Sequence, residues 1–357
     1  MKIILYIFIF LYFPIGLQAN LNNSKIEKIT PDLSNLWGIV KLNNSEILVT
    51  QRSGKLFKVD VFKKKTLEIK NLPKVIAKKQ GGLLDIEIKK TSEKLFVYIC
   101  FSKPEKNKLS STAIVEAELS GSMLTKQKII FKTEAHKSSV HFGCRLLINN
   151  NSLYATLGDR GNRKNSQNPK NYAGSTIKLS LPENSIINKN TKSWEKNIFS
   201  IGHRNSQGMA MNPNTGEIWQ HEHGPKGGDE INIIKKEKNY GWPIVTHGNE
   251  YWGGQISNYK TKLGYEDPVW VWIPSIAPSG MVFYDKEMFK ELNGNLLVGS
   301  LKFRRIYKIE LEYNLPVREE IVLDNKLGRI RDIEIMDDGS LLIINDEVNG
   351  GVYRIYN

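Results

Sequence analysis

Cysteine is scarce in this sequence. Only Cys100 and Cys144 occur among 357 residues. Two thiols cannot build a disulfide scaffold in a chain this long, so a hydrophobic core has to provide its stability. Sequence spacing alone does not decide whether the two cysteines pair in an oxidising compartment. The default prediction is a pair of buried free thiols.

Long hydrophobic runs are absent except at the N-terminus. There, one lysine precedes an apolar run from Ile3 to Phe13, a Pro-Ile-Gly break follows, and a small residue stands at Ala19. This is the layout of a secretory signal peptide, predicted here as residues 1–19. The run is short for a membrane span, so we expect no stable membrane insertion, although an uncleaved anchor is the alternative. Either way the body of the protein is predicted to be exported, as a periplasmic or secreted protein.

Acidic residues are fewer than basic ones, 37 against 51, which gives a formal net charge of +14. The lysines are scattered, the only tight run is residues 63–65, and no nucleic-acid-binding motif accompanies them. We therefore predict a solvated basic surface and no nucleic-acid partner. A basic field of this size could still help to gather an anionic small molecule.

Strong amphipathic helical patterns are also scarce, and what recurs instead is a pair of apolar strands separated by a polar gap. Six such couples occur at intervals of roughly 40 to 60 residues. The couples are "EILVT" with "KLFKVD", "KLFVYICF" with "AIVEAELS", "SLYATLGDRG" with "STIKLSL", "GEIWQHEHGP" with "DEINIIK", "NLLVGSLK" with "RIYKIEL", and "SLLIIND" with "GVYRIY". Six repeated antiparallel units favour an all-β fold, a six-bladed β-propeller formed by residues 20–357 as a single domain. The alternative is a pair of β-sandwiches.

Ring closure and loop placement follow from the propeller interpretation. The segment "KIEKIT", residues 25–30, could pair with the last blade and so remove exposed sheet edges. Polar loops between strands would converge on the central funnel, which predicts one shared face for His141, Asp159, Arg204, Asn205, the motif at residues 221–232 and Lys302.

The motif "HEHGPKGGDEIN" at residues 221–232 allows several kinds of site. It is not a helical zinc pair, but His221 and His223 would share a face of an extended strand, so a metal site stays open. It lacks the Gly-Lys-Ser/Thr ending of a phosphate loop. Its Gly and Pro residues suit a turn that aims carbonyl oxygens at calcium, with the carboxylate of Asp229 nearby. The alternative is an ordinary blade loop capped by Asp229.

Two other motifs carry acid–base and anion-binding side chains. A histidine oriented by a carboxylate is a usual general base, which His141 and Asp159 could form, although any single histidine is more often structural. The loop "GHRNSQGM" gathers Arg204, Asn205 and Gln207, and such guanidinium and amide donors suit an oxygen-rich anionic partner.

Seven motifs occur together in one order: "HFGCRL", "TLGDRG", "GHRNSQGM", "EHGPKGGDEIN", "NYGWP", "PSIAPSGMVFY" and "LVGSLKFRRIYKIEL". In this register the chain resembles the soluble dehydrogenases that depend on pyrroloquinoline quinone (PQQ), the glucose/sorbosone dehydrogenase family, and most of all its aldose sugar dehydrogenase branch. The likeness runs from about Trp37 to the C-terminus. It implies a six-bladed propeller with PQQ lying in the funnel and calcium (Ca2+) holding it.

The resemblance also implies roles for individual residues. His141 matches the general base, Asp159 the acid that orients it, and Arg204 a donor to the reactive quinone carbonyl. The residues that match cofactor contacts are Gln80, Arg204, Asn205, Lys302, Arg329 and Arg331. The carbonyls of Gly224 and Pro225 match calcium ligands, with Asp229 supporting their loop, while His223 stands where relatives can carry Gln and receives no ligand role.

The implied reaction is oxidation of the anomeric carbon of an aldose sugar to a lactone, with hydride transfer to PQQ. Two departures concern the site: Cys144 stands where Gly or another small residue is usual, and Ile273 where glucose-oxidising enzymes have an aromatic residue. The sequence does not determine the sugar or the electron acceptor, and it predicts a monomer. The rival functions are a calcium-dependent propeller lactonase and a non-catalytic carbohydrate-binding propeller.

Overall fold

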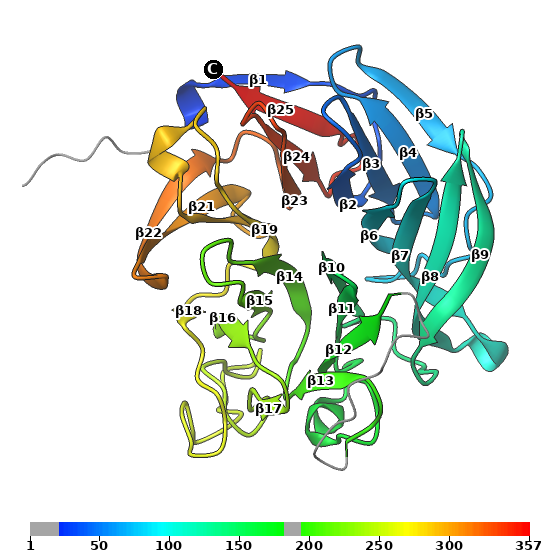
Figure 1. Ribbon diagram of the computed structural model, residues 1–357. Coiled ribbons are helices and arrows are strands. Elements are labelled where there is room, and N and C mark those ends of the chain that lie inside the picture. The colour runs from blue at the N-terminus through cyan, green and yellow to red at the C-terminus, as the bar shows by residue number, and fades with distance from the viewer. Residues whose placement is uncertain (1–20, 182–193) are drawn as a thin grey trace, which may run out of the picture.

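The described part of the protein, residues 21–181 and 194–357 of a computed structural model, forms one ring of six antiparallel sheets (Figure 1). The six-bladed propeller prediction is confirmed, and the pair of sandwiches is excluded. The predicted signal peptide, residues 1–19, lies outside the described residues. Within the described ranges no helix is long and apolar enough to cross a membrane.

The first three blades run from the N-terminal side of the chain to its middle. Blade 1 contains β2 (Leu36–Lys41), β3 (Glu46–Gln51), β4 (Lys55–Asp60) and β5 (Lys65–Ile69). Blade 2 contains β6 (Leu83–Lys90), β7 (Leu95–Pro104), β8 (Ser110–Ser120) and β9 (Met123–Lys132). Blade 3 contains β10 (Gly143–Asn149), β11 (Ser152–Leu157), β12 (Ser175–Ser180) and β13 (Ile198–Ile201), and the short β17 (Lys238–Asn239) joins β13 in parallel.

The last three blades complete the ring. Blade 4 contains β14 (Ser206–Met211), β15 (Ile218–Glu222), β16 (Asp229–Ile234) and β18 (Trp270–Trp272). Blade 5 contains β19 (Pro278–Phe283), β20 (Leu296–Ser300), β21 (Arg305–Glu312) and β22 (Leu315–Asp324). Blade 6 contains β23 (Ile330–Ile335), β24 (Leu341–Asn345), β25 (Val352–Tyr356) and β1 (Lys25–Lys28). The described helical turns are short 3-10 segments: η1 (Leu21–Asn23), η2 (Lys106–Lys108), η3 (Arg163–Gln167) and η4 (Lys290–Leu292).

Blade 6 closes the ring with strands from both ends of the chain. In Figure 1 the blue β1 lies beside the red β25, and the register pairs Lys25 with Tyr356 and Lys28 with Tyr353. The predicted closing segment is therefore confirmed as the outer strand of the last blade. The backbone hydrogen bonds of β1 cover the edge of β25, so that edge is not open to pairing with another chain.

The six inner strands are β2, β6, β10, β14, β19 and β23, and each has a register shift against the next strand near its start. Glycines in this layer leave room for side chains of the next blade. A Cβ on Gly38 would lie 2.6 Å from Asp85 Oδ1, and one on Gly280 would lie 2.1 Å from Asp332 Oδ1. Irregularities of this kind re-aim side chains, and here they turn charged groups toward the propeller axis.

Arg145 connects its own blade 3 to three other blades across the axis. Its Nη1 donates to Asp85 at 3.1 Å and to Asp332 at 2.6 Å, and its Nε donates to the carbonyl of Gln207 at 3.0 Å. Trp37 covers the guanidinium, with the ring centroid 4.6 Å from Arg145 Cζ. Because all three charged groups are buried, removal of one would leave an uncompensated charge in the centre of the ring.

A cavity of about 90 Å³ lies along the axis beside this cluster, with Asp85, Glu87, Asp332 and Glu334 among its lining residues. Burial raises the pKa of Asp85 to about 7, against the opposing effect of Arg145. Burial also raises the pKa of Glu334 to about 7, although the backbone N–H of Lys41 and that of Ile335 donate to its carboxylate. Ionisation of these groups is therefore harder in the folded protein than in the unfolded chain.

The raised pKa of Glu334 predicts a stability that falls with rising pH. The stabilisation relative to the unfolded chain is complete below the ordinary pKa of 4.5 and is lost as pH rises through about 7. Glu334→Gln should reduce the loss of unfolding free energy between about pH 5 and about pH 8 by on the order of 2 kcal/mol. Urea unfolding at the two pH values measures this, with the exposed Glu93→Gln as the control. An unchanged pH dependence in Glu334→Gln would contradict the prediction.

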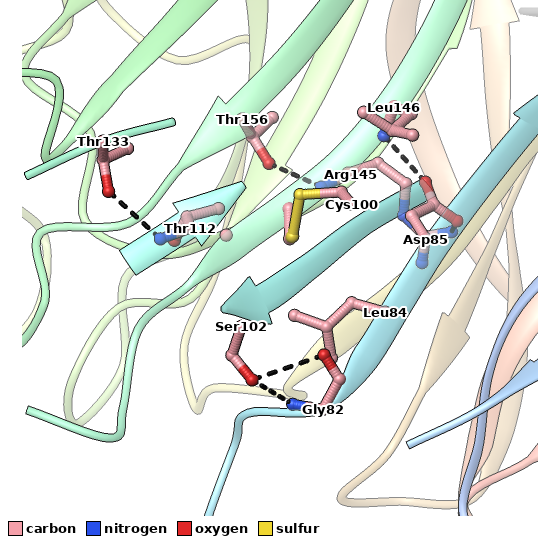
Figure 2. Close-up of a disulfide and its surroundings, with 12 residues drawn as sticks. Gly82, Leu84, Asp85, Cys100, Ser102, Thr112, Thr133, Arg145, Leu146 and Thr156 are labelled. Atoms are coloured by element: carbon pink, nitrogen blue, oxygen red, sulfur yellow. Dashed lines mark hydrogen bonds and ion pairs between the residues drawn. A yellow bond between two sulfur atoms is a disulfide. The ribbon is translucent and has the colours of Figure 1, made fainter. Parts of the chain in front are cut away.

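Cys100 and Cys144 form a disulfide, so the default prediction of free thiols is wrong. Figure 2 shows the bond linking β7 of blade 2 to β10 of blade 3, next to Arg145. The cysteines are 44 residues apart, but the ring packs their strands together with a Cα–Cα distance of 5.6 Å, which suits a disulfide. Folding into neighbouring blades creates this proximity, and the spacing in the sequence does not reveal it.

Candidate functional site

A cavity of about 270 Å³ opens at the end of the propeller axis where the inner strands begin. We call it the well. Four predicted site residues line it: Gln80, Asn205, Arg329 and Arg331. Two kinds of loop build this face of the propeller. One kind connects the second and third strands of a blade, and the other kind lies just before an inner strand. Strands from different blades thus bring distant parts of the sequence to one opening.

His141 and Asp159 form a hydrogen-bonded pair beside the well. His141 Nδ1 lies 2.7 Å from Asp159 Oδ1, and the next residue in the chain, Phe142, lines the well. Trp242 Nε1 donates to Asp159 Oδ2 at 2.9 Å, and the backbone N–H of Gly161 donates to Oδ1 at 2.7 Å. With Nδ1 held by the carboxylate, Nε2 is the ring nitrogen of His141 that can accept a proton.

The carboxylate of Asp159 stays ionised despite its burial. Burial alone would raise its pKa, but the hydrogen bond and charge of His141, the N–H of Gly161 and the charge of Arg204 outweigh it and lower the pKa below the ordinary value. An ionised Asp159 fixes the His141 ring and stabilises an imidazolium when the ring takes a proton.

Gln80 and the backbone of His141 are joined directly. The N–H of His141 donates to Gln80 Oε1 at 2.6 Å. His141 itself has a left-handed backbone, with φ of 51°. Gln80 therefore lies beside His141, and its contact is with the main chain of that residue.

Arg204 and Asn205 lie immediately before β14. The N–H of Arg204 donates to Glu222 Oε1 at 2.9 Å, and its Nη1 donates to the carbonyls of His223 and Gly224 at 2.9 and 3.2 Å. Asn205 Oδ1 accepts the N–H of Gly143 at 3.3 Å, which leaves its amide nitrogen as the group that can donate into the well. Asn205 therefore lines the well, whereas Arg204 does not line it and contacts the turn at residues 223–224 instead.

The glycine-rich turn before β16 is supported by Asp229. Its Oδ1 accepts the N–H of Gly224 at 2.7 Å, and its Oδ2 accepts the N–H of Ala277 at 2.8 Å. A Cβ on Gly224 would lie 2.3 Å from the carbonyl oxygen of Gly227, so the turn needs glycine there. Both carboxylate oxygens of Asp229 are engaged with the backbone, as expected of a residue that supports the loop.

The two histidines of this motif have separate environments. His221 is fully buried beneath Gly208, and burial, followed by the charges of His223 and Arg145, lowers its pKa well below the ordinary value. His223 lines the well, and its Nε2 lies 2.6 Å from the carbonyl of Pro278. Within residues 21–181 and 194–357, no group of three or more His, Cys, Asp or Glu side chains could hold a metal. The strand-face zinc alternative therefore has no ligand set in this region.

Positive charge concentrates on the side of the well formed by blades 1 and 6. Arg331, 6% exposed, donates from Nη2 to Asp346 Oδ2 at 2.9 Å, while its Nε is buried without a hydrogen-bond partner. Arg329 donates to the carbonyl of Leu301 at 3.2 Å and lines the same wall. Arg52 also lines the well, and its Nε is likewise buried and unpartnered. Donors that lack partners beside an open cavity suit a ligand with several carboxylates.

Lys302 and Pro225 do not line the well. Lys302 follows the lining residue Leu301, and its Nζ donates to the carbonyl of Ser275 at 3.0 Å. Pro225 is buried in the turn after Gly224. Of the two carbonyls predicted to bind calcium, that of Gly224 accepts a hydrogen bond from Arg204 Nη1 at 3.2 Å, and carbonyl oxygens are ligands that calcium accepts.

Several lining residues are not among the predicted cofactor contacts: Trp37, Arg52, Gln207, His223 and Asp346. The sequence predicts Gln207 only as a donor to an anionic partner and His223 only as part of a possible metal site. Arg52 and Asp346 each lie between the second and third strands of a blade, which was the predicted position for site residues. This position is the signal that could have identified Arg52 and Asp346 from the sequence.

Comparisons with known proteins identify relatives that match nearly the whole chain. The family described as Glucose / Sorbosone dehydrogenase matches residues 33–354. The aldose sugar dehydrogenase YliI of Escherichia coli (strain K12) is 32% identical over 342 residues, covering 92% of each protein. Quinoprotein glucose dehydrogenase B of Acinetobacter calcoaceticus is 25% identical, covering 89% of this chain and 84% of that protein. The crystal structure of the E. coli aldose sugar dehydrogenase in its apo form superposes with a TM-score of 0.86 at 31% identity, covering 93% of this chain and 99% of that one.

Proposed function

The chain belongs to the glucose/sorbosone dehydrogenase family, and from this premise we propose that it is a PQQ-dependent aldose sugar dehydrogenase. The proposed reaction oxidises the anomeric carbon of an aldose to a lactone. The observation that carries it is the His141–Asp159 pair beside a well whose arginines have buried donors without partners. Such a site offers a proton acceptor and a binding place for a polyanion next to each other.

The residues of the well fit PQQ, which carries several carboxylates. Arg331, Arg329 and Arg52 would bind those carboxylates, with Lys302 adding positive charge from beside Leu301. Gln80 and Asn205 would add neutral hydrogen bonds. When bound, PQQ would supply the hydride acceptor, and calcium on the carbonyls of Gly224 and Pro225 would supply positive charge.

The protein's own contribution is to orient the sugar and move its proton. Nε2 of His141 would take the proton of the anomeric hydroxyl, because Nδ1 is held by Asp159. The ionised Asp159 would stabilise the resulting imidazolium. Arg204 and Asn205 would donate hydrogen bonds toward the oxygen that gains negative charge, and donors fixed before the reaction are the effective kind.

We also propose export, with residues 1–19 as a signal peptide and the mature domain from residue 20. The Cys100–Cys144 disulfide supports this, because such bonds persist in oxidising compartments. A periplasmic or secreted monomer is the form that the proposal specifies.

Reconstitution tests the function directly. Purified apo-protein should reduce a redox dye in the presence of an aldose only after PQQ and calcium are added, and the dye reduction should fall when a chelator removes calcium. A panel of aldoses then defines the sugar. Absence of PQQ-dependent dye reduction with every aldose would contradict the proposal, and lactone hydrolysis with calcium alone would identify the lactonase alternative instead.

A further inference from the structure

We propose that the Cys100–Cys144 disulfide is a positioning device for His141: it holds the loop that carries the base in a left-handed backbone conformation that glycine would adopt unaided. This inference rests on the proposed role of His141, but it concerns the geometry of the loop and has a readout that is independent of activity.

The segment from His141 to Cys144 has an unusual backbone. His141, Gly143 and Cys144 have φ values of 51°, 65° and 77°. Glycine accepts this region freely, but a residue with a Cβ is disfavoured there. Such conformations persist only where the surrounding structure imposes them, and they cluster at functional sites. Two of the three residues are not glycine, so something outside the segment has to hold it.

The disulfide supplies a covalent restraint at the end of this segment. Cys144 is the second residue of β10, and Cys100 lies within β7 of the neighbouring blade. Both cysteines are 0% exposed. They share a hydrophobic cluster with Phe142, which forms part of the well. The tether therefore lies next to Phe142 and Gly143, which line the well, and three residues from the proposed base.

The strand that carries Cys100 also holds the loop of Gln80. Ser102 Oγ accepts the N–H of Gly82 at 2.7 Å and donates to the carbonyl of Ile76 at 2.7 Å. Figure 2 shows Ser102 and Gly82 in contact beside Cys100. Cys100 and Ser102, two residues apart on β7, thus hold two loops, one that carries His141 and one that carries Gln80. These loops meet where Gln80 Oε1 accepts the N–H of His141. The convergence of both restraints on one strand indicates a rigid support for the base.

Loss of the tether should displace the base more than it disturbs the well. Without the bond, an alanine at position 144 would favour an ordinary backbone, which would rotate the chain that leads to His141. The contact of its ring with Asp159 would then weaken. The arginines on blades 1 and 6 do not depend on this loop, so PQQ binding should change little.

A glycine substituted at position 144 distinguishes two roles of the disulfide, support of the left-handed backbone and general stabilisation of the fold. The φ of 77° at Cys144 lies in a region that glycine adopts freely. If the disulfide compensates for a residue with a Cβ, glycine should restore the loop without any covalent link. If the bond acts only by general stabilisation, glycine should behave no better than alanine.

The tether is best cut by substitution, because a thiol or phosphine reductant could also reduce the quinone. The variants are Cys100→Ala/Cys144→Ala and Cys100→Ala/Cys144→Gly, reconstituted as full-length holoenzymes. Ile114→Val is the packing control, because it removes buried volume from the same cluster. Thermal unfolding sets an assay temperature at which all forms are folded.

The expected kinetic result is a split between turnover and binding. The alanine pair should lose about 10- to 100-fold in kcat, because a small misplacement of a catalytic group costs this much. The affinity for PQQ should stay within about threefold, since its proposed charged contacts, the arginines of blades 1 and 6, lie outside this loop. The glycine pair and Ile114→Val should keep kcat within about threefold of wild type, because glycine accepts the left-handed backbone.

A second readout needs neither cofactor nor turnover. In apo-protein with ¹⁵N-labelled histidine, the Nδ1–H proton that His141 shares with Asp159 should give a downfield NMR resonance, assigned by its loss in His141→Gln. The resonance should persist in wild type and the glycine pair and vanish or broaden in the alanine pair.

Wild-type kcat and an intact resonance in the alanine pair would overturn the proposal. Equal loss in the glycine and alanine pairs would overturn the claim that the bond replaces glycine. If wild-type protein oxidises no aldose but the resonance changes as expected, the positioning role stands and the proposed function fails.

Discussion

His141→Ala is expected to lower kcat for PQQ-dependent aldose oxidation by about 10²- to 10⁴-fold, the range for loss of a general base. The reason is geometric, because Nε2 of His141 is the ring nitrogen left free by the hydrogen bond to Asp159. PQQ affinity should change little, since the buried arginine donors that would hold the cofactor lie on other blades. Dye-linked kinetics with saturating PQQ and calcium measure the first effect, and an absorbance titration of PQQ measures the second.

A matched control separates this role from the general effects of losing a histidine. His136→Ala makes the same change five residues upstream, in a segment paired with Ser110 through the backbone. It should keep most of the activity. Turnover in His141→Ala close to that of wild type would eliminate His141 as the base, whatever cofactor the protein uses.

The second large effect is expected at Arg331. Arg331→Met should weaken PQQ binding by at least about 30-fold, because truncating a buried, hydrogen-bonding charge that faces an opposite charge costs several kcal/mol. Arg331 Nε is buried without a partner, so a carboxylate of the cofactor would satisfy it. Burial lowers the pKa of this guanidinium, which increases the gain from an anionic partner. The titration of apo-protein with PQQ measures the change.

Asp346 complicates this experiment, because it forms an ion pair with Arg331 at 2.9 Å and would keep only the weaker ion pair with Arg329 at 3.7 Å. The double variant Arg331→Met/Asp346→Asn removes both charges and should recover much of the stability that the single variant loses. It should not recover PQQ affinity. Recovery of affinity in the double variant would show that Arg331 only neutralises Asp346.

The six predicted strand couples correspond to the second and third strands of each blade, such as β3 with β4 and β24 with β25. These strands are apolar on both faces because neighbouring blades cover them, so their pattern is strong. The sequence pattern does not predict the innermost strand of each blade. Sequences such as "IRDIEI" at residues 330–335 combine charged side chains with a register shift, and this weakens the strand pattern where the site is built.

The predicted site residues divide in a similar way. The partnership of His141 with Asp159 could be predicted because both lie in motifs with recognisable acid–base chemistry. The disulfide could not, since its geometry depends on how β7 and β10 pack in three dimensions. Arg52 belongs to no recognisable motif, so its position between β3 and β4 was the only signal that could have identified it before the fold placed it in the well.

The account depends on one claim, that the well at the end of the axis is the PQQ site. Diffraction from crystals of the protein grown with PQQ and calcium tests it most directly. The account predicts a planar density in the well, with its carboxylates against Arg329 and Arg331 and its quinone edge toward Asn205 and His141. A well without the quinone, or a quinone bound elsewhere on the protein, would contradict it.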